Sequence, residues 1–558
     1  MKKIFALSTM AAAMVLAGCG GGDININAQN NSTTTGSGGD SGASNNCASY
    51  SKSGTTYQGA ANGVNCVYGT EFVSLVNPID IGPASTVVFT NLANDGVHIF
   101  NDSLVVGRNY SNDADLASAG IAKGGDGSKI QIEAGATLAF KSSDDYVVIN
   151  RGSQIFAEGT ATAPITITSV SDAVDGTVGA EEVQAWGGMI INGFGLTNKC
   201  EYTGSPATND LATTASGCHV AAEGKAGAGQ SHYGGANNAD NSGSLKYFIV
   251  KHTGAQVEEG NELNGISFDA VGSGTSVDFL QAYSTYDDGI EMFGGAVNIS
   301  HYIAMYVRDD SIDIDEGYSG TIDYALVIQS ETDGNHCVES DGIGSYSSKD
   351  QATLDDFVAR GLNSRATIKN LTCIISSNDG PAEAMGLGTH DPGAGLRIRE
   401  AHFPIIQNAL ITTAYQGDVK LNDTDHNYCV RIESAEGLQA AVDGDLVIES
   451  SIIACSDLTK GAVLPNNKTE LEFLNETNQT LATLEAGEDP TAASNANLDI
   501  LDSFYSLPVS EMKIGGAAPT VAPIGRAFFG AVVKDDDWTA GWAYGIDPAN
   551  RGQALWFD

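Results

Sequence analysis

The sequence predicts an all-β fold, in which short strands stack as successive coils of a solenoid and a small region caps the C-terminus. One short pattern occurs twice, 22 residues apart, as DGIEMF at 288–293 and DSIDID at 310–315. In both copies apolar residues alternate with carboxylates, as in a strand with one buried face. Gly is 67 of 558 residues and charged residues are 17%, which is typical of a turn-rich β protein. An internal repeat of this kind indicates stacked coils.

The N-terminus has the pattern of a processing signal. Two lysines precede an apolar run at 4–16, which is too short to span a bilayer. Residues 16–19, LAGC, resemble the lipobox of bacterial lipoproteins. That resemblance implies that 1–18 is a signal peptide and that Cys19 becomes the lipidated, palmitate-carrying first residue. Because Gly20 follows in place of Asp, it also implies the outer membrane, on its periplasmic or cell-surface side.

Residues 20–46 are mostly Gly, Ser, Asn and Thr, with too few apolar side chains to form a core. We therefore expect 19–65 to be the lipidated cysteine followed by a flexible tether.

Two families of strand-like segments recur between 66 and 460, where we expect the solenoid. One predicted sheet contains 245–250, 277–280, 297–300, 322–325, 368–371 and 446–449, and the other contains 264–268, 288–292, 310–314, 336–340, 394–398 and 428–432. Small residues recur at spacings of 24, 22, 26, 58 and 34, so we expect inserted loops, the main ones at 196–241 and 344–366. Within the second loop, 354–360 is expected to be a short helix. Residues 152–167 resemble the opening coils of right-handed parallel β-helices, which makes this the predicted fold.

The C-terminal region, 461–558, is predicted to be a helical and aromatic cap. Residues 468–486 have helical spacing and good helix formers. The tail from Trp538 to Asp558 is rich in aromatic residues, which we expect to cap the last coil. The alternative is a platform on which carbohydrate stacks.

Eight cysteines remain besides Cys19, and an even number in an exported chain predicts disulfides. Many pairings are open, and pairing of near neighbours is the simplest. It gives the bonds Cys47–Cys66, Cys200–Cys218, Cys337–Cys373 and Cys429–Cys455.

The formal net charge is −42, so nucleic acid is excluded as a partner. Cations such as Ca²⁺ and neutral or basic ligands remain, and an acidic surface that only confers solubility is the alternative.

Aligning the coils predicts two columns of side chains on the outer face of the second sheet. One column is Ser267, Glu291, Asp313, Glu339, Arg397 and Arg431, and the other is Asp269, Phe293, Asp315, Asp341, Arg399 and Glu433. Carboxylates stacked ~4.8 Å apart repel one another unless a cation bridges them or one is protonated. The columns therefore predict either a Ca²⁺ site among Glu291, Asp313, Asp315 and Glu339 or perturbed carboxyl pKa values of the kind found at functional sites. They also predict a ligand-binding face made by Glu291, Phe293, Arg397, Arg399 and Arg431, on which the arginines neutralise carboxylates or grip an anion.

A turn column formed by Asn264, Asp288, Asp310 and His336 precedes these strands. Such a column at β-helix corners satisfies backbone N–H groups, and this is its structural interpretation.

The same residues allow a catalytic interpretation. Three motifs, 285–290 (TYDDGI), 309–312 (DDSI) and 397–399 (RIR), resemble those of polygalacturonases, which are also right-handed β-helices. The resemblance implies that Asp288, Asp309 and Asp310 protonate a glycosidic oxygen and activate water, and that Arg397 and Arg399 bind a uronate. The family's Gly-His-Gly is present only as Asn335-His336-Cys337, so the catalytic set would be Asp288, Asp309, Asp310 and His336.

A broader resemblance covers the chain from about 129 to the C-terminus. Segments such as 186–193 (WGGMIING), 287–295 (DDGIEMFGG) and 538–542 (WTAGW) are similar to those of uncharacterised β-helix lipoproteins of Gram-negative outer membranes. The resemblance implies capture of a glycan or another extracellular ligand, beside a TonB-dependent transporter. The alternatives are a polysaccharide hydrolase or lyase and a structural or adhesive surface protein.

Overall fold

The structure is a computed structural model that describes residues 46–224, 227–258, 261–331, 333–376, 393–413, 428–455, 457–484 and 498–557. The chain divides into two units, Met1–Ser44 and Asn45–Asp558, and every described residue lies in the second. The expected signal peptide, Cys19 and the tether up to residue 45 lie outside the described residues. No helix within the described ranges has both the length and the apolar character needed to cross a bilayer.

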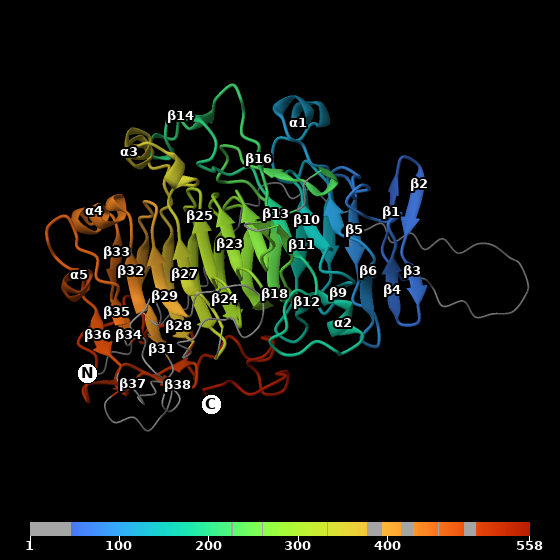
Figure 1. Cartoon of the computed structure of the whole chain (residues 1–558). Coiled ribbons are helices and arrows are strands. Elements are labelled where there is room, and N and C mark those ends of the chain that lie inside the picture. Colours follow the sequence, from blue (N-terminus) through green and yellow to red (C-terminus); the bar gives the residue numbers. More distant parts are fainter. Residues whose placement is uncertain are drawn as a thin grey trace, which may run out of the picture. The chain divides into compact units, whose positions relative to one another are not determined.

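A ten-stranded parallel sheet forms one side of the molecule (Figure 1). Its strands are β7 (Leu104–Val106), β10 (Tyr146–Ile149), β13 (Gly188–Asn192), β21 (Ile266–Asp269), β23 (Ile290–Phe293), β25 (Ile312–Asp315), β27 (His336–Ser340), β29 (Ala394–Ile398), β32 (Tyr428–Ile432) and β35 (Asp457–Thr459). They pair in chain order, one strand for each coil, as expected of a parallel β-helix. The fold class predicted from the repeat is confirmed.

The other side of each coil belongs to an eighteen-stranded sheet. Five coils contribute one long strand: β18 (Gly243–Thr253), β22 (Ser276–Thr285), β24 (Asn298–Met305), β26 (Thr321–Ile328) and β28 (Thr367–Ile375). Other coils contribute two short strands, namely β5 (Thr86–Phe89) and β6 (Val97–Phe100), β8 (Lys129–Ile132) and β9 (Thr137–Phe140), β11 (Gln154–Glu158) and β12 (Ile165–Ser169), β30 (Ile405–Gln407) and β31 (Leu410–Thr413), and β33 (Val447–Glu449) and β34 (Ile452–Cys455). Strands β3 (Ala60–Asn62), β4 (Asn65–Tyr68) and β36 (Thr480–Thr483) complete it.

The register of this sheet differs from the sequence alignment by two residues in two coils, those of 297–300 and 446–449: Ile368 aligns through Ile406 with Ile448 and not with Leu446. Val277 pairs with Ile299 and not with Val297, so the strand lies two residues further along the chain. A shift of two residues keeps every side chain on the same face, and therefore the apolar pattern alone does not distinguish the two registers.

The core between the two sheets is built from columns of apolar side chains. Ile266, Ile290 and Ile312 are Cα partners on successive strands, and each is fully buried. Their outward neighbours are polar or charged, which is why the strands alternate in sequence.

The long strands bend where one residue in each coil takes the left-handed conformation. These residues are Tyr247, Phe279, His301, Tyr324 and Asn370, and Asn408 takes the same conformation between the short strands β30 and β31, with φ between 45 and 58° throughout. The first four stack as a ladder of rings, with centroids 4.3, 4.3 and 4.8 Å apart. The strained backbone of one coil is therefore supported by the matching ring of the next.

The segment 46–65 differs from the expected tether. It contains β1 (Ser49–Lys52), β2 (Thr55–Gln58) and β3, and the Cys47–Cys66 disulfide joins it to the first coil. Tyr50 stacks on Tyr57 and contacts Phe72, which supplies the apolar burial that the composition of 20–46 lacks.

All four disulfides join near neighbours, so the predicted pairing is confirmed.

The predicted helix at 354–360 lies within α3 (Gln351–Arg360). The other helices are α1 (Asp113–Ala119), α2 (Val170–Ala173), α4 (Ala435–Asp443), α5 (Glu470–Glu476), η1 (Pro206–Thr208), η2 (Gly227–Gly229) and η3 (Tyr346–Ser348). Outside the two main sheets lie the hairpins β14 (Tyr202–Thr203) with β15 (Ala212–Thr213), β16 (Val220–Ala221) with β17 (His232–Tyr233), β19 (Gln256–Glu258) with β20 (Asn261–Glu262), β37 (Leu498–Asp499) with β40 (Lys513–Ile514), and β38 (Leu501–Asp502) with β39 (Tyr505–Ser506).

The helix expected over 468–486 is mostly wrong. Of the residues described in this range, 468–484, only those of α5 are helical. The helix starts at a Thr469–Glu472 capping box, and Asn478 then takes a left-handed conformation that ends it. The chain continues as β36, which pairs in parallel with β34 and extends the eighteen-stranded sheet beyond residue 460.

The aromatic tail covers the side of the β-helix, so the expectation that it caps the last coil is wrong. Trp542 contacts the rings of Tyr247 and Phe279, and Trp556 Nε1 donates to the carbonyl of Gln329 at 2.9 Å. Figure 1 shows this red segment running beneath the strands of the central coils. The reason is that the outward side chains of the long strands are themselves apolar and need cover, among them Ile249, Ile303, Leu326 and Ile374.

Candidate functional site

The expected outward column is present on the ten-stranded sheet. Ser267, Glu291, Asp313, Glu339, Arg397 and Arg431 are Cα partners on successive strands. The second column begins as expected with Asp269, Phe293 and Asp315. The repeat therefore predicts correctly which side chains share a face.

The turn column forms a ladder of hydrogen bonds between coils. Asn264 Oδ1 accepts from the backbone N–H of Asp288 at 3.1 Å, and Asp288 Oδ1 accepts from that of Asp310 at 3.1 Å. Asp310 Oδ1 in turn accepts from the backbone N–H of His336 at 2.7 Å. These bonds agree with the structural interpretation, and they occupy carboxylate oxygens that the catalytic interpretation would use.

His336 lies in a buried chain of polar groups. Its Nδ1 lies 2.8 Å from Asp310 Oδ1 and its Nε2 lies 2.9 Å from the hydroxyl of Tyr428. Burial lowers the pKa of His336 to about 4, so the ring is neutral at neutral pH. Its tautomer then donates from Nδ1 to the carboxylate and accepts the tyrosine proton at Nε2.

Carboxylates from two adjacent coils, those of β23 and β25, converge beside this ladder. One oxygen from each of Asp288, Glu291 and Asp313 lies within 4.8 Å of the others, and the same holds for Asp287, Asp288 and Asp309. We call these five residues the acidic cluster. Burial is the main cause that raises the pKa of Asp287, Asp288, Glu291 and Asp313 well above the usual range, and neighbouring carboxylates add to it.

The acidic cluster fits a hard cation in its chemistry. Asp313 Oδ1 is buried and has no hydrogen-bond partner among the described residues. All the donors are carboxylate oxygens, which Ca²⁺ prefers. Glu291 and Asp313 therefore come together as predicted, and Asp288 joins them.

The other two predicted cation ligands lie elsewhere. Glu339 groups with Asp310 and His336, and its oxygens contact Arg397 and Arg399. Asp315 Oδ1 accepts from the backbone N–H of Glu316 at 2.5 Å. Both carboxylates therefore have protein partners, of which the aligned columns indicate the arginines beside Glu339 and not the backbone N–H beside Asp315.

The predicted arginines form ion pairs along the same face. Arg397 lies 3.0 Å from Glu339 and 3.2 Å from Glu433, and Arg399 lies 2.5 Å from Asp341. Arg431 contacts Glu433. The arginine side chains are 22 to 31% exposed, so each keeps donors at the surface while it neutralises a carboxylate. We call this part of the sheet, from β25 to β32, the mixed-charge face.

Loop 196–241 covers the other half of the sheet. Phe293 is 5% exposed and its ring lies 6.1 Å from that of Tyr233 on the loop. Phe293 therefore makes an apolar contact beneath the loop, and the structure does not place it on an open ligand-binding face.

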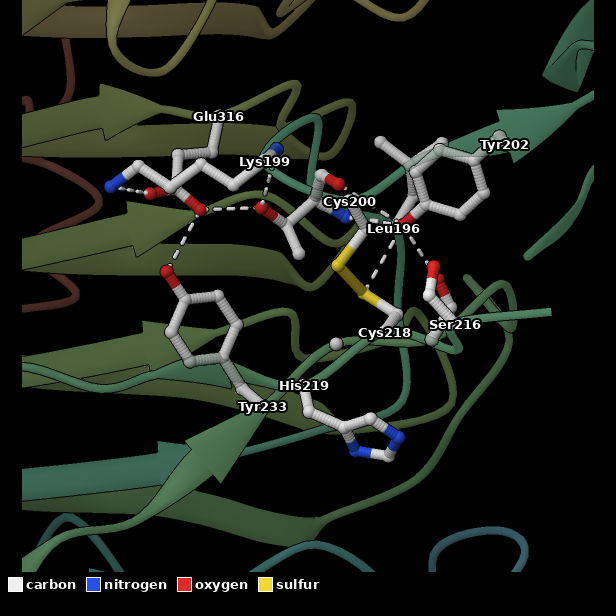
Figure 2. The surroundings of a disulfide bond; sticks show 12 residues. Leu196, Lys199, Cys200, Tyr202, Ser216, Cys218, His219, Tyr233 and Glu316 are labelled. Atoms are coloured by element: carbon white, nitrogen blue, oxygen red, sulfur yellow. Dashed lines mark hydrogen bonds and ion pairs between the residues drawn. A yellow bond between two sulfur atoms is a disulfide. The ribbon is translucent and has the colours of Figure 1, made fainter. Parts of the chain in front are cut away.

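Figure 2 shows how the loop is fixed. The Cys200–Cys218 disulfide closes it, Lys199 Nζ lies 2.5 Å from Glu316 Oε1, and the Tyr233 hydroxyl donates to Glu316 Oε2 at 2.8 Å. Glu316 is fully buried and the Lys199 side chain is 35% exposed, so only the glutamate end of this ion pair is shielded from water.

Sequence reasoning missed Asp287 and Tyr428 as members of the site. The doublets Asp287-Asp288 and Asp309-Asp310 could have identified Asp287, because the repeat places two carboxylates at both of these corners. For Tyr428 the signal is its place in the aligned strands, because 428–432 and 336–340 put Tyr428 and His336 at the same position.

Comparison with known families identifies one match. Residues 110–543 match the pectate-lyase-like beta helix domain. Comparison with curated proteins gave no significant match, and comparison with solved structures gave none. The match covers more than half of the chain and includes the central coils of both main sheets. The fold of this domain is one of carbohydrate-active and carbohydrate-binding proteins. The chain therefore belongs to the family of pectate-lyase-like β-helix domains.

Proposed function

We propose that this chain binds an extracellular glycan on the mixed-charge face, with Ca²⁺ held in the adjacent acidic cluster. The observation that supports the proposal most directly is the convergence of Asp288, Glu291 and Asp313, whose oxygens lie within 4.8 Å of one another. Three carboxylates at this separation, two of them buried and Asp313 partly buried, are unfavourable without a cation or protons. The family membership adds that the fold is one used with carbohydrates.

The chemistry of the face favours an anionic glycan. Arg397, Arg399 and Arg431 follow the acidic cluster along the sheet and retain exposed donors. Guanidinium groups bind carboxylates through paired hydrogen bonds, and a cation at the cluster bridges protein and ligand carboxylates. A uronate-containing polymer is the ligand class that uses both features.

Binding of polygalacturonate, followed by isothermal titration calorimetry in CaCl₂ and in EDTA, tests the proposal. We expect binding in CaCl₂ that EDTA abolishes. Glu291→Gln with Asp313→Asn should remove the cation dependence, and Arg397→Gln should weaken binding in CaCl₂. Asp175→Asn changes an exposed carboxylate outside the face and is the matched control. Equal binding of a carboxyl-reduced polymer would contradict the proposed recognition of uronates.

A polysaccharide hydrolase or lyase is the second candidate, and one observation favours it. Asp287 and Asp309 are only half-buried, and burial, with Asp309 as the next cause, raises the pKa of Asp287 well above its usual value. A carboxyl group with a raised pKa is what a general acid requires. Release of reducing ends or unsaturated products from polygalacturonate, lost in Asp287→Asn, would establish this candidate.

We also propose that Cys19 carries a lipid that anchors the chain to the outer membrane, where it acts beside a TonB-dependent transporter. The lipobox-like residues 16–19 support the anchor. Labelling cells with a palmitate analogue tests it, because the label should enter the wild-type chain and not Cys19→Ala. Absence of label from both, or copurification of no transporter with the chain, would remove the corresponding part of this proposal.

A further inference from the structure

A second group of buried oxygen atoms lies outside the acidic cluster, at the ends of β13 and β21. Asn192 and Asp269 are Cα partners on these adjacent strands, and they are 0% and 1% exposed. Each follows a residue that packs into the core, Ile191 or Phe268, so both side chains lie on the outer face of the sheet. This face is the part that loop 196–241 covers, through residues such as Ala222 and Tyr233.

These oxygens lack donors. Neither carboxylate oxygen of Asp269 has a hydrogen-bond partner in the described part of the chain, and the same is true of Asn192 Oδ1. The amide nitrogen of Asn192 donates to Ser231 Oγ on the loop at 3.3 Å, which fixes which end of the amide carries the free oxygen. Adjacent parallel strands are ~4.8 Å apart, so the free oxygens belong to neighbouring positions.

The surroundings offer little compensation for the charge of Asp269. On the next strand Phe293 packs beneath Tyr233, which makes that side apolar. Lys199 is the cation that acts on Asp269, and its ammonium group is already paired with the buried Glu316. Burial, followed by the charges of Glu223 and Glu316, raises the pKa of Asp269 well above its usual range.

A small cavity lies on the opposite side. Its volume is about 120 Å³, and its lining includes Asn150, Ser231 and Gln230. Asn150 Oδ1 is a further buried oxygen without a partner among the described residues. Asn150 directly follows Ile149, which pairs with Ile191, so it lies one strand away from Asn192. The cavity has room for water molecules beside Asn150 and Ser231, one strand away from Asn192.

We propose that Asp269 and Asn192 hold a Ca²⁺ ion between the ten-stranded sheet and loop 196–241. A carboxylate with both oxygens free and an amide oxygen are hard ligands of the kind that Ca²⁺ takes, and water would supply its remaining ligands. The set contains no sulfur or imidazole, which softer metals prefer. The ion neutralises Asp269. It also holds the side chain of Asn192, whose amide nitrogen donates to Ser231 on the loop, and in this way it links the loop to the sheet.

This site shares no residue with the acidic cluster, so the two can be tested separately. The full chain is stripped with EDTA, dialysed into CaCl₂ of known concentration, and its bound calcium is measured by atomic emission. Asp269→Asn should bind one ion fewer per chain than the wild type. Glu291→Gln with Asp313→Asn should retain the ion at Asp269, and Asp278→Asn, on the other sheet, is the control. Asn192→Ala serves as a second variant, and its affinity for calcium should fall at this site.

Two further readouts separate a cation from a proton. Addition of CaCl₂ should raise the melting temperature of the wild type and slow hydrogen exchange in 196–241. In Asp269→Asn the contribution of this site to both effects should be lost. In EDTA, Asp269→Asn should melt no lower than the wild type, because the uncompensated charge is gone. Unchanged calcium content in Asp269→Asn would overturn the proposal. So would loop protection in the wild type that responds to acidification and not to calcium.

Discussion

At the scale of single residues, the same carboxylates serve two purposes. Asp288 and Asp310 accept backbone N–H groups of the following coil, and Asp288 also belongs to the acidic cluster. Their hydrogen bonds compensate part of the cost of burial. Other charged groups offset the rest of the cost of burying these carboxylates: arginines contact Glu339, and we propose a cation beside Asp313.

Arg399 provides a test of the first form of compensation. Arg399→Met leaves Glu339 and Asp341 without this partner, and burial raises the pKa of Asp341 to about 6 even with the arginine present. We expect the free energy of unfolding to fall by about 1–3 kcal/mol in urea titrations at neutral pH. Arg108→Met, at a pair whose arginine is 59% exposed, should change it by about 0–1 kcal/mol. A smaller effect of Arg399→Met than of Arg108→Met would contradict this assignment.

The acidic cluster predicts an unusual dependence of stability on pH. A carboxyl group whose pKa is raised on folding binds protons more tightly in the folded state, so unfolding releases them. Stability then falls as pH rises from the unfolded pKa of about 4 towards the raised folded pKa. Calorimetric melts in EDTA should show this fall, and Glu291→Gln with Asp313→Asn should flatten it. CaCl₂ should also flatten it in the wild type. A wild-type profile in EDTA as flat as that of the double variant would refute the prediction.

At the scale of elements, loop 196–241 decides which half of the ten-stranded sheet is open. Its disulfide, its ion pair with Glu316 and the contact between Tyr233 and Phe293 hold it over β13, β21 and β23. The mixed-charge face begins where this cover ends. The loop therefore limits the candidate ligand face to β25–β32.

Removal of the Cys200–Cys218 disulfide should loosen this cover. The bond closes a loop with a sequence separation of 18, for which the expected stabilisation is about 2–4 kcal/mol. In the variant with both cysteines changed to serine, limited proteolysis should cut within 196–241 before any other described segment. The Cys47–Cys66 bond has a similar separation of 19, and its removal should leave 196–241 resistant. Equal protection of 196–241 in both variants would show that the disulfide does not hold the loop.

At the scale of the whole molecule, the sequence predicts the stacked coils more accurately than it predicts the positions of the loop and the tail that cover them. The period of two and the repeated Asp-Gly and Asp-Ser corners determine the core columns and the order of Glu291, Asp313 and Glu339. The predicted pairing of near neighbours is correct because Cys337–Cys373 and Cys429–Cys455 each join neighbouring strands of the stack, and Cys200–Cys218 closes a single loop. The burial of Phe293 is not predictable in this way, because the composition of an insertion does not say over which face it folds. For the same reason, the sequence wrongly predicts that the aromatic tail caps the last coil.

The tail should contribute strongly to the stability of the β-helix. Trp542 is 1% exposed and covers the rings of Tyr247 and Phe279, so Trp542→Ala should lower the free energy of unfolding by about 3–5 kcal/mol. Ile524→Ala, at a side chain that is 45% exposed on the same region, should have a much smaller effect. Chemical unfolding followed by tryptophan fluorescence and by circular dichroism measures both. Similar losses in the two variants would contradict a burying role for the tail.

The central claim is that Ca²⁺ in the acidic cluster and the arginines beside it bind an anionic glycan. Its most direct test is the titration of polygalacturonate into the wild-type chain and into Glu291→Gln with Asp313→Asn, each in CaCl₂ and in EDTA. We predict binding by the wild type in CaCl₂ alone, and loss of this calcium-dependent binding in the variant. Binding that is the same in CaCl₂ and EDTA, or the same in the two proteins, would contradict the claim.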